Sequence, residues 1–224
     1  MRPAIIVMSR VPLPGRTKTR LMSHLTAEQC AGLQWAMLRD LGRVLGRLDI
    51  SLIVFYCDGT PGELARVLGP GIYLPQTGTN LGKRMATAVD YCLKQGFDRV
   101  VVTGTDYPAL QPEDIRQALS ALGKREVVIG PSLDGGYYLL AVKKLYAEMF
   151  SLKEWWTDTV LQNTLGNLRG SSISYCLLKP GRDLDTFEDA KFYYQLMLKE
   201  KTEFEVFPNN TFSYLHDIFG QPEV

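Results

Sequence analysis

The sequence predicts an α/β fold, a three-layer α/β/α sandwich built on a mostly parallel sheet. Strand and helix candidates alternate along the chain, which is typical of βαβ units covered by helices on both faces. The segment 99–104 is a continuous run of mostly β-branched residues, as expected for a central parallel strand buried on both sides. Glycine- and proline-rich loops separate the elements, and no repeat or low-complexity linker interrupts them.

The first half of the chain predicts four strands with helices between them. Strands are expected at 4–8, 51–57, 72–74 and 99–104. A long helix follows a capping box formed by Thr26 and Gln29, because apolar residues recur at helical spacing as far as Leu48. A short helix is expected at 63–68, and another at 81–94 with Asn80 as its N-cap.

The second half continues the pattern. Pro112 suits the first turn of a helix that runs to Leu122. Two strands, 126–130 and 137–142, are followed by a helix around 157–168, a strand at 172–178 and a helix at 187–199. Residues 202–224 show no clear period. We therefore expect one domain over 1–200 and a tail, 201–224, that packs on the domain or on a partner.

Charge and composition exclude several classes of protein. The chain has 224 residues, 46% of them hydrophobic, and a formal net charge of +1, which argues against a nucleic-acid partner. The first apolar run is too short for a signal peptide, and no stretch approaches the roughly 20 apolar residues that span a bilayer. Four dispersed cysteines indicate buried thiols in a reducing compartment. These features predict a soluble, cytoplasmic protein with no membrane partner.

Any bound metal would depend on carboxylates. The chain has only two histidines, His24 and His216, and no closely spaced cysteine pair. Oxygen ligands favour Mg²⁺ or Mn²⁺ over Zn²⁺.

The loop after the first strand carries the strongest functional signal. It contains four cations, Arg10, Arg16, Lys18 and Arg20, together with Gly15. Ligands bind at the carboxyl edge of open α/β sheets, and such a loop can hold phosphate there. It lacks the Gly-Lys-Ser/Thr step of a P-loop and the glycine spacing of a dinucleotide site. The alternative is a solvated basic turn.

Three carboxylates also lie at expected turns. Asp106 follows the central strand, where it can hold a divalent cation or simply stabilise the turn before Pro108. Asp185 precedes the last predicted helix, and either Asp185 or Thr186 can cap it. Asp134 is expected in a turn, where it can act as a base or accept a substrate hydroxyl.

Weaker signals extend the candidate binding site. Gly135 and Gly136 would let a substrate approach the backbone, although Asp-Gly-Gly is also an ordinary hairpin turn. Further candidate contacts to base, sugar or phosphate are Gln76, Gly82, Arg84, Trp156 and Thr157. Core packing is the alternative for the adjacent tryptophans Trp155 and Trp156.

Taken in order, these motifs resemble a family with a nucleotide-diphospho-sugar transferase (GT-A-like) fold. That family is glycosyltransferase-like, is associated with arsenosugar biosynthesis, and is more distantly similar to the 2-phospho-lactate and molybdenum-cofactor guanylyltransferases. The resemblance covers residues 4–199. It rests on the motifs PLPGRTKTRL at 12–21, LGKRM at 81–85, GTDYPAL at 104–110, GPSLDGGYY at 130–138, WT at 156–157 and DLDT at 183–186.

The resemblance implies roles for named residues. Asp106 and Asp185 would share one Mg²⁺ or Mn²⁺ ion. The residues themselves, apart from the resemblance, suggest that Lys18 acts in catalysis by neutralising charge on the leaving phosphate, with Asp134 as a base or acceptor contact. Three features depart from the family pattern. Arg10 stands where lysine is usual, Phe187 replaces a proline, and the Asp-x-Asp of metal-dependent glycosyltransferases is absent at Asp106.

The sequence therefore predicts a metal-dependent transferase that takes a nucleotide or nucleotide-sugar donor and a small-molecule acceptor. Nucleotidyl transfer and glycosyl transfer both fit. The alternatives are a non-catalytic nucleotide-binding or regulatory module on the same fold, and a structural subunit. The sequence leaves the oligomeric state open, with a homodimer as one of the states considered.

Overall fold

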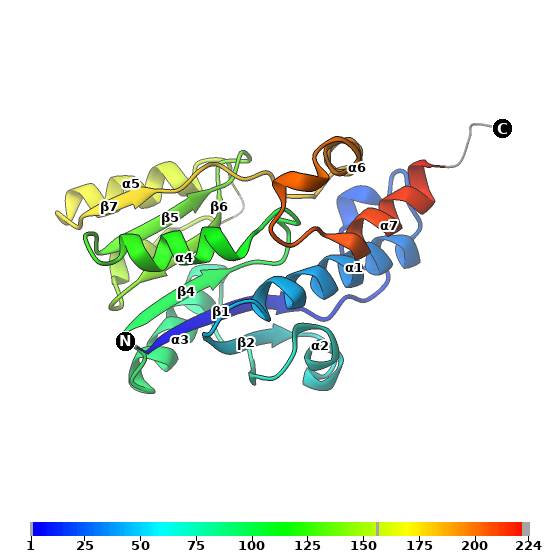
Figure 1. Ribbon diagram of the computed structural model, residues 1–224. Coiled ribbons are helices and arrows are strands. Elements are labelled where there is room, and N and C mark those ends of the chain that lie inside the picture. Colours follow the sequence, from blue (N-terminus) through cyan, green and yellow to red (C-terminus); the bar gives the residue numbers. More distant parts are fainter. Residues whose placement is uncertain (1, 156, 221–224) are drawn as a thin grey trace.

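Seven strands form one mixed sheet at the centre of the molecule (Figure 1). The computed structural model describes residues 2–155 and 157–220. In spatial order the strands are β3 (Ile72–Pro75), β2 (Ser51–Cys57), β1 (Pro3–Arg10), β4 (Arg99–Thr103), β6 (Tyr137–Val142), β5 (Val127–Pro131) and β7 (Tyr175–Leu177). Only β6 runs antiparallel to its neighbours, β4 and β5. The predicted α/β class with a mostly parallel sheet is confirmed.

The strand directions bring six loops to one edge of the sheet. Because β1 to β4, β5 and β7 all run the same way, their carboxyl ends meet there. The turn between β5 and β6 is one of these six loops. Motifs separated by more than 160 residues in sequence therefore become neighbours, which is the usual geometry of a ligand site in open α/β sheets.

Alternating strand residues divide the core into two layers. Ala4 and Ile6 of β1 pack with α3 (Leu81–Lys94), α5 (Val160–Gly170) and the 3₁₀ turn η2 (Ala147–Phe150). Ile5 and Val7 pack on the opposite face with α1 (Ala27–Leu45), α2 (Pro61–Leu68) and α4 (Pro112–Ala121). The two-residue period of a strand thus supplies both hydrophobic faces that a three-layer sandwich requires.

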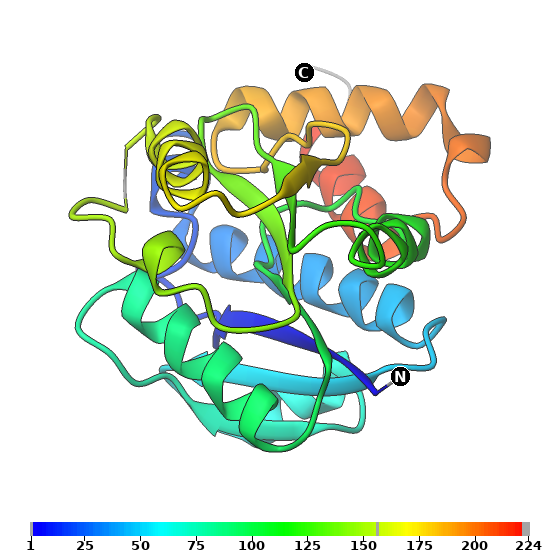
Figure 2. The same ribbon diagram turned by 90° about the vertical axis from the view of Figure 1, so that its left-hand side faces the viewer.

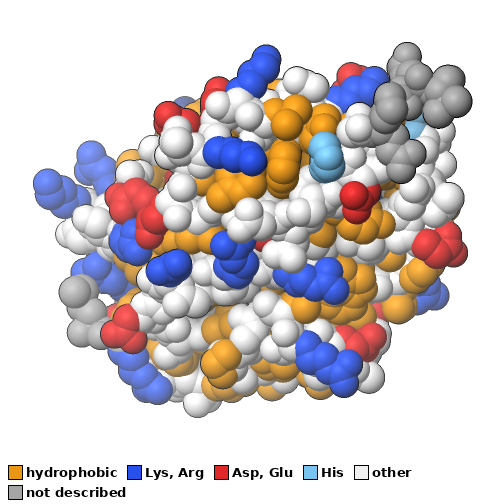
Figure 3. Space-filling model, turned by 45° about the vertical axis from the view of Figure 1, so that its right-hand side comes forward, with side chains coloured by type: hydrophobic (Ala, Val, Ile, Leu, Met, Phe, Trp, Pro, Cys, Tyr) orange, Lys and Arg blue, Asp and Glu red, His pale blue; other side chains and the backbone are white. Residues whose placement is uncertain are grey.

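A further helical layer covers the outer face of α1. It consists of α6 (Phe187–Lys199) and α7 (Asn209–Phe219), which lie side by side in both ribbon views (Figures 1 and 2). The 3₁₀ turn η3 (Lys201–Glu203) lies between them. Leu33 and Met37 of α1 pack with Tyr193 and Leu215 in this layer. On this side of the molecule, hydrophobic atoms reach the surface between charged side chains (Figure 3).

The tail, whose sequence shows no clear period, contains the helix α7. Its N-terminal cap comes from Asp40 of α1, which is 3% exposed. The carboxylate accepts hydrogen bonds from the backbone nitrogens of Asn210 (3.1 Å) and Thr211 (2.7 Å) and from both of their side chains. A cap supplied across 170 residues leaves no local sequence signal.

The remaining differences from the sequence prediction are local. The loop after Lys18 forms a 3₁₀ turn, η1 (Thr19–Leu21), and the helix expected around 157–168 begins at Val160. Of the four thiols, Cys30 and Cys92 are buried, whereas Cys57 and Cys176 are half-buried. In the described ranges, no helix combines the length and apolar character that crossing a membrane would need.

Candidate functional site

A cleft of about 830 Å³ opens at the carboxyl edge of the sheet. Loops after β1, β4 and β7, the turn between β5 and β6, and the start of α3 contribute side chains to it. Its volume lies within the range of about 300–1,000 Å³ that is usual for small-molecule sites. Ten of its lining residues are charged, five of each sign: Arg10, Arg16, Lys18, Arg20, Arg84, Asp106, Asp134, Asp158, Asp183 and Asp185.

Lys18 connects three loops at the centre of this cleft. Its Nζ atom donates to Asp106 Oδ1 (2.5 Å), to the Leu184 carbonyl oxygen (2.5 Å) and to Asp185 Oδ1 (3.1 Å). The side chain is only 3% exposed. A backbone hydrogen bond from Leu184 to the Asp106 carbonyl (2.7 Å) ties the two acidic loops directly together. The sequence motifs therefore meet as the resemblance implied, with Lys18 between the two carboxylates.

Opposing effects act on the pKa of Lys18. Burial alone lowers the pKa, because removing an ammonium group from water disfavours its charge. The carboxylates of Asp106 and Asp185 outweigh that effect and raise the pKa above its usual value. Lys18 is therefore a fixed positive charge that holds two acids together, and it is not a neutral amine.

Lys18 reaches this position through an unusual backbone conformation. Its φ is +49° and its ψ is +42°, in the left-handed region, immediately before η1. A non-glycine residue in this region carries a conformational cost that surrounding contacts must offset. Here the three hydrogen bonds of Nζ supply those contacts.

Thr186, and not Asp185, caps the start of α6. Its side chain accepts a hydrogen bond from Asp189 N (3.2 Å) and caps the helix, while the carboxylate of Asp189 accepts from Thr186 N (2.8 Å). Asp185 is thereby left free to face the cleft, with its side chain 36% exposed. The threonine cap thus sets the position of the neighbouring acid.

Two arginines of the first loop are held by an acid that sequence reasoning missed. Asp58, just after β2, lies 3.4 Å from Arg10 Nε and 3.5 Å from Arg16 Nη1. Both guanidinium groups remain largely accessible, at 49% and 65% exposure. Asp58 has a φ of +59°, which places it in the left-handed region of a turn, and its Asp-Gly sequence was the available signal.

Gln76 and Arg84 line the cleft on the same side as Arg10 and Arg16. Gln76 Nε2 donates to the Ser9 and Phe55 carbonyl oxygens at 3.0 Å, which ties the end of β3 to β1 and β2. Arg84 donates through Nε to the Gly78 carbonyl (3.2 Å) and through Nη1 to Gln76 Oε1 (3.4 Å). The glutamine thus orients the arginine, and both line the cleft.

Arg20 lies on the outer rim of the same loop. Its Nη1 is 3.9 Å from Asp185 Oδ2, and its side chain is 68% exposed. It can therefore swing toward a bound anion at little cost.

Asp183 is a second acid that the sequence analysis did not select, although it lies two residues before Asp185. Its Oδ2 accepts a hydrogen bond from Ser132 Oγ (3.0 Å). Burial, followed by the charges of Asp106 and Asp134, raises its pKa to about 7. The spacing of the two acids in Asp-Leu-Asp was the signal that could have identified it.

Asp134 and its neighbours form the opposite wall. Asp134 is exposed, and its Oδ1 accepts a hydrogen bond from Gly136 N (2.9 Å). Asp134, Gly136 and Thr157 all line the cleft. The turn geometry expected for Asp-Gly-Gly is present, and it directs this carboxylate to the site.

The structure places the other predicted glycines away from the surface of the cleft. An added Cβ on Gly82 would lie 2.3 Å from Trp155, whose ring packs over it and is 6% exposed. Gly135 has a φ of +90° and lies against the Asp158 carbonyl, which an added Cβ would approach to 1.9 Å. Gly15 has a φ of +74° with open space around it. These glycines shape the chain, and Trp155 has the packing role given as its alternative.

Trp156 was also predicted to bind substrate, but it lies outside the described residues.

The donor chemistry of the acidic pair suits a hard cation. Asp106 and Asp185 offer carboxylate oxygens only, and both are partly open to the cleft. Lys18 binds Oδ1 of each, so the Oδ2 atoms are the ones left for an ion. Mg²⁺ typically binds through one or two carboxylates, with waters and substrate phosphates as its other ligands. Within the described part of the chain, no group of three or more His, Cys, Asp or Glu residues forms a complete metal site. The arrangement therefore fits an ion that a phosphate ligand helps to hold.

Gln34 of α1 forms hydrogen bonds to Thr105, the residue before Asp106. Its Nε2 donates to the Thr105 carbonyl (3.1 Å) and hydroxyl (3.0 Å) oxygens. Its Oε1 is buried without a hydrogen-bond partner, although Gln34 lines the cleft. An unpaired acceptor in a cleft wall is a position for a ligand donor.

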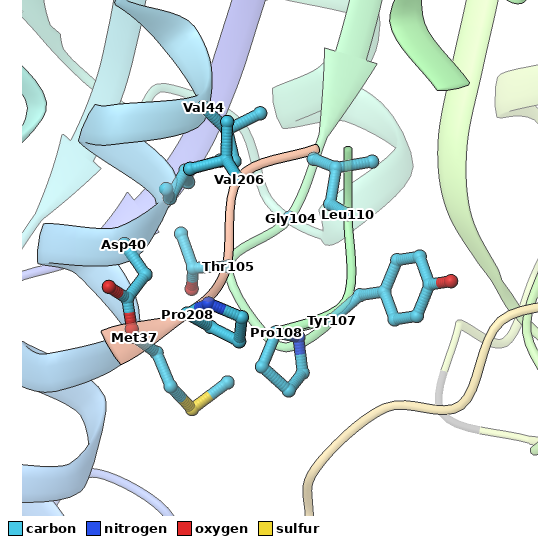
Figure 4. A pocket seen from close by; sticks show the side chains of 11 residues that line it. Met37, Asp40, Val44, Gly104, Thr105, Tyr107, Pro108, Leu110, Val206 and Pro208 are labelled. Carbon is cyan, nitrogen blue, oxygen red and sulfur yellow. The ribbon is translucent and has the colours of Figure 1, made fainter. Parts of the chain in front are cut away.

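A second cavity, behind the Asp106 loop, is too small for a substrate. It has a volume of about 10 Å³ and lies between α1, the loop after β4 and the segment before α7 (Figure 4). This space suits at most one water molecule. The large cleft is thus the better candidate for the functional site.

A family model matches residues 40–157 of this arrangement, which is just over half of the chain. Its description is "Uncharacterized protein conserved in bacteria (DUF2064)". The chain belongs to the DUF2064 family.

Curated relatives with a named activity resemble this DUF2064 protein over part of their length. The 2-phospho-L-lactate guanylyltransferase of Methanothermobacter thermautotrophicus is 32% identical over 140 residues, 62% of this chain and 61% of the relative. The enzyme of the same name from Methanobrevibacter smithii is 25% identical over 57% of each chain. The chain thus spans about three fifths of the length of these relatives.

Solved structures agree with the fold described above. A protein of Desulfovibrio desulfuricans G20, provisionally named a nucleotide-diphospho-sugar transferase, has 29% identity and a TM-score of 0.88. The match covers 97% of this chain and 95% of that one. A cytidylyltransferase from Leptospira borgpetersenii has a TM-score of 0.59 over 100% of this chain and 99% of its own, but at 13% identity it supports the fold alone. The predicted nucleotide-diphospho-sugar transferase fold is therefore confirmed.

Proposed function

We propose that this DUF2064 protein is a nucleotidyltransferase that moves a nucleoside monophosphate from a nucleoside triphosphate to a small acceptor. One observation carries the proposal: Lys18 joins Asp106 and Asp185 in a cleft that also presents Arg10, Arg16 and Arg84. A triphosphate carries about four negative charges, and clustered arginines bind such groups through paired hydrogen bonds. The resemblance to guanylyltransferases supports the same reaction type.

The donor would lie along the cationic wall. Arg10 and Arg16, held by Asp58, would contact the outer phosphates, because their guanidinium groups face solvent while their positions are fixed. Arg84, oriented by Gln76, would contact the phosphates from the α3 side. Pre-positioned cations stabilise charge that develops on departing pyrophosphate without reorganising during the reaction.

Lys18 would keep the reacting centre assembled. Its three hydrogen bonds fix the Asp106 and Leu184–Asp185 segments against each other, so both carboxylates stay at the α-phosphate position. Asp106 and Asp185 would hold Mg²⁺ or Mn²⁺, which would supply charge neutralisation at the phosphates.

Asp134 would bind or deprotonate the acceptor. It lies on the wall opposite the arginines, is exposed, and is free to accept a proton or a hydrogen bond through its Oδ2 atom. A carboxylate within hydrogen-bond reach of an attacking oxygen is a suitable general base.

The direct experiment is a product assay. The protein is incubated with each α-³²P-labelled nucleoside triphosphate, with Mg²⁺, Mn²⁺ or a chelator, and a mixture of small acceptors. We expect release of pyrophosphate and label in a new ester, both absent in the Asp106→Asn variant. A protein that binds nucleotide but releases no pyrophosphate with any acceptor would be a binding module, as in the alternative from the sequence.

Glycosyl transfer is the second candidate, because aromatic side chains and acids share one wall. Tyr137 and Trp155 line the cleft close to Asp134 and Asp158 in the chain. Aromatic rings and carboxylates together are common partners of polyhydroxylated ligands. Release of a nucleoside diphosphate from a nucleotide sugar, with transfer of labelled sugar, would identify this reaction.

A further inference from the structure

The charges of the cleft are divided between two walls. The cationic groups Arg10, Arg16 and Arg84 belong to the β1 loop and α3, beyond the β1 side of the sheet. The acidic groups Asp134, Asp158 and Asp183 belong to segments that follow β5, η2 and β7, on the other side of β4. A phosphate-rich donor fits the first wall, so the second wall is left for the acceptor.

The acidic wall lacks compensating charge. Asp106 and Asp185 already share Lys18, and the Arg20 guanidinium approaches Asp185 alone. In the part of the chain that the structure describes, none of Asp134, Asp158 and Asp183 forms an ion pair; the ion pairs at the cleft use Asp58, Asp106 and Asp185. An acceptor on this wall therefore meets a negative potential.

Gln34 adds an observation that does not depend on the acids. It is 4% exposed, lines the cleft beside the Asp106 loop, and its Oε1 has no hydrogen-bond partner. Its amide nitrogen is already bound to Thr105, so Oε1 is a buried acceptor that a ligand donor could satisfy only by entering this part of the cleft. The carboxylates of Asp134 and Asp158 and the amide oxygen of Gln34 accept hydrogen bonds and offer none.

We propose that the acceptor is an uncharged or positively charged polyhydroxylated compound, such as a sugar or an amino sugar, that attacks through a hydroxyl oxygen. The hydroxyl and ammonium groups of such a molecule supply hydrogen-bond donors to the acceptor atoms of this wall. An acceptor bearing a phosphate and a carboxylate, as the name 2-phospho-L-lactate implies for the curated relatives, would bring acceptor atoms and negative charge to a wall that already has both. This inference rests on the proposed nucleotidyl transfer.

The chemical step balances without a further reactant. The acceptor oxygen forms a bond to the α-phosphorus, and the bond from that phosphorus to the bridging oxygen breaks, with its electron pair leaving on pyrophosphate. The hydroxyl proton goes to the Asp134 carboxylate and then to water. The product is a phosphodiester between the nucleoside and the polyol.

The first arm of the test compares acceptors that share one sugar ring and differ in a single substituent that changes the charge. Glucose, glucosamine and glucose 6-phosphate are tested with the nucleoside triphosphate that gives the largest thermal stabilisation, and 2-phospho-L-lactate is tested beside them. We expect the kcat/KM for glucosamine to be equal to or above that for glucose. We expect the kcat/KM for glucose 6-phosphate to be at least about tenfold lower than that for glucose at low salt. A phosphorylated acceptor that is used better than its unphosphorylated parent would overturn the proposal.

The second arm measures the charge of the wall without any turnover. In a Cys57→Ser background, Thr157→Cys places a thiol on the acidic wall, and Thr87→Cys on α3 outside the cleft is the matched control. Each variant reacts with a cationic and an anionic methanethiosulfonate reagent. We expect the cation-to-anion rate ratio at position 157 to exceed that of the control by about tenfold. Asp134→Asn should reduce it.

The two arms separate the possible failures. If no nucleotide stabilises the protein or releases pyrophosphate, the proposed function fails while the reagent ratio still reports on the wall. If nucleotide binds but the anionic reagent reacts as fast as the cationic one at position 157, the acceptor inference is wrong and nucleotide transfer stands.

Discussion

The Asp183→Asn variant should become more stable than the wild-type protein as the pH rises. Asp183 has a folded-state pKa of about 7 against an ordinary value of 3.8, because burial and then the charges of Asp106 and Asp134 disfavour its ionised form. Between these values the folded state holds a proton that the unfolded chain has lost, so the stability contributed by Asp183 falls with increasing pH. Asparagine cannot ionise and avoids this loss.

The size of the effect follows from the two pKa values. The difference of about 3 units corresponds to about 4 kcal/mol at 1.36 kcal/mol per unit, as an upper limit reached above pH 7. Well below pH 4, Asp183 is protonated in both the folded and the unfolded state. The variant and the wild-type protein should then differ little in stability. The hydrogen bond from Ser132 Oγ (3.0 Å) can be kept, because the asparagine side-chain oxygen also accepts it.

The assay is urea unfolding of both proteins at pH 4, 5, 6, 7 and 8, with a chelator and no nucleotide. Taking the difference between variant and wild type cancels the titration of groups that the substitution leaves alone. Asp158→Asn, which removes an exposed acid of the same cleft, is the control for the loss of one carboxylate at this site. A difference for Asp183→Asn that is constant from pH 4 to 8, or that falls with pH, would refute the reasoning.

Three further substitutions test the architecture of the site and of the tail. Lys18→Met should abolish nucleotide-induced thermal stabilisation, since the acids that share Nζ would then repel each other; retained stabilisation would show that Lys18 does not assemble the site. Gly135→Ala should destabilise the protein by at least about 2 kcal/mol in urea unfolding, because the added Cβ meets a backbone carbonyl at 1.9 Å and φ is +90°. Gly166→Ala in α5, where no atom lies within 4 Å, is its control and should change stability by no more than about 1 kcal/mol in either direction; equal effects would contradict the steric argument. Asp40→Ala should cost about 2–4 kcal/mol and speed hydrogen exchange across α7, because four donors lose their acceptor; unchanged exchange would mean that α7 is held by packing alone.

The order of the elements could be predicted from local signals. The capping residues Thr26 and Asn80 act where the sequence placed them, and each accepts the expected hydrogen bond from a backbone nitrogen three residues on. The strand expected at 99–104 is the central β4 (Arg99–Thr103), which is buried from residue 100 to residue 103 as its β-branched run indicated. These features depend on contacts within a few residues, so the sequence displays them directly.

The segments that line the cleft could be predicted from the sequence, but the ion pairs between their side chains could not. The cationic loop, Asp106 and Asp185 were selected because they follow strand ends, and strand ends share an edge. That Lys18 pairs with both acids, and that Asp58 holds two arginines, depends on distances between segments up to 167 residues apart. Gln34 carried no local signal, because it lies within a helix. Asp183 did carry one in the Asp-Leu-Asp spacing, but it stood beside a stronger candidate, Asp185.

By itself the sequence determined the α/β class, the succession of elements and the edge of the sheet where chemistry is concentrated, because hydrophobic period, caps and turn residues are local properties. Only the tertiary structure decided which charges meet. It placed Lys18 between two acids, directed the arginines to one wall and the unpaired carboxylates to the other, and gave α7 its cap from Asp40. The physical reason is that electrostatic energies depend on the distances between groups and on their burial, and those are properties of the folded chain.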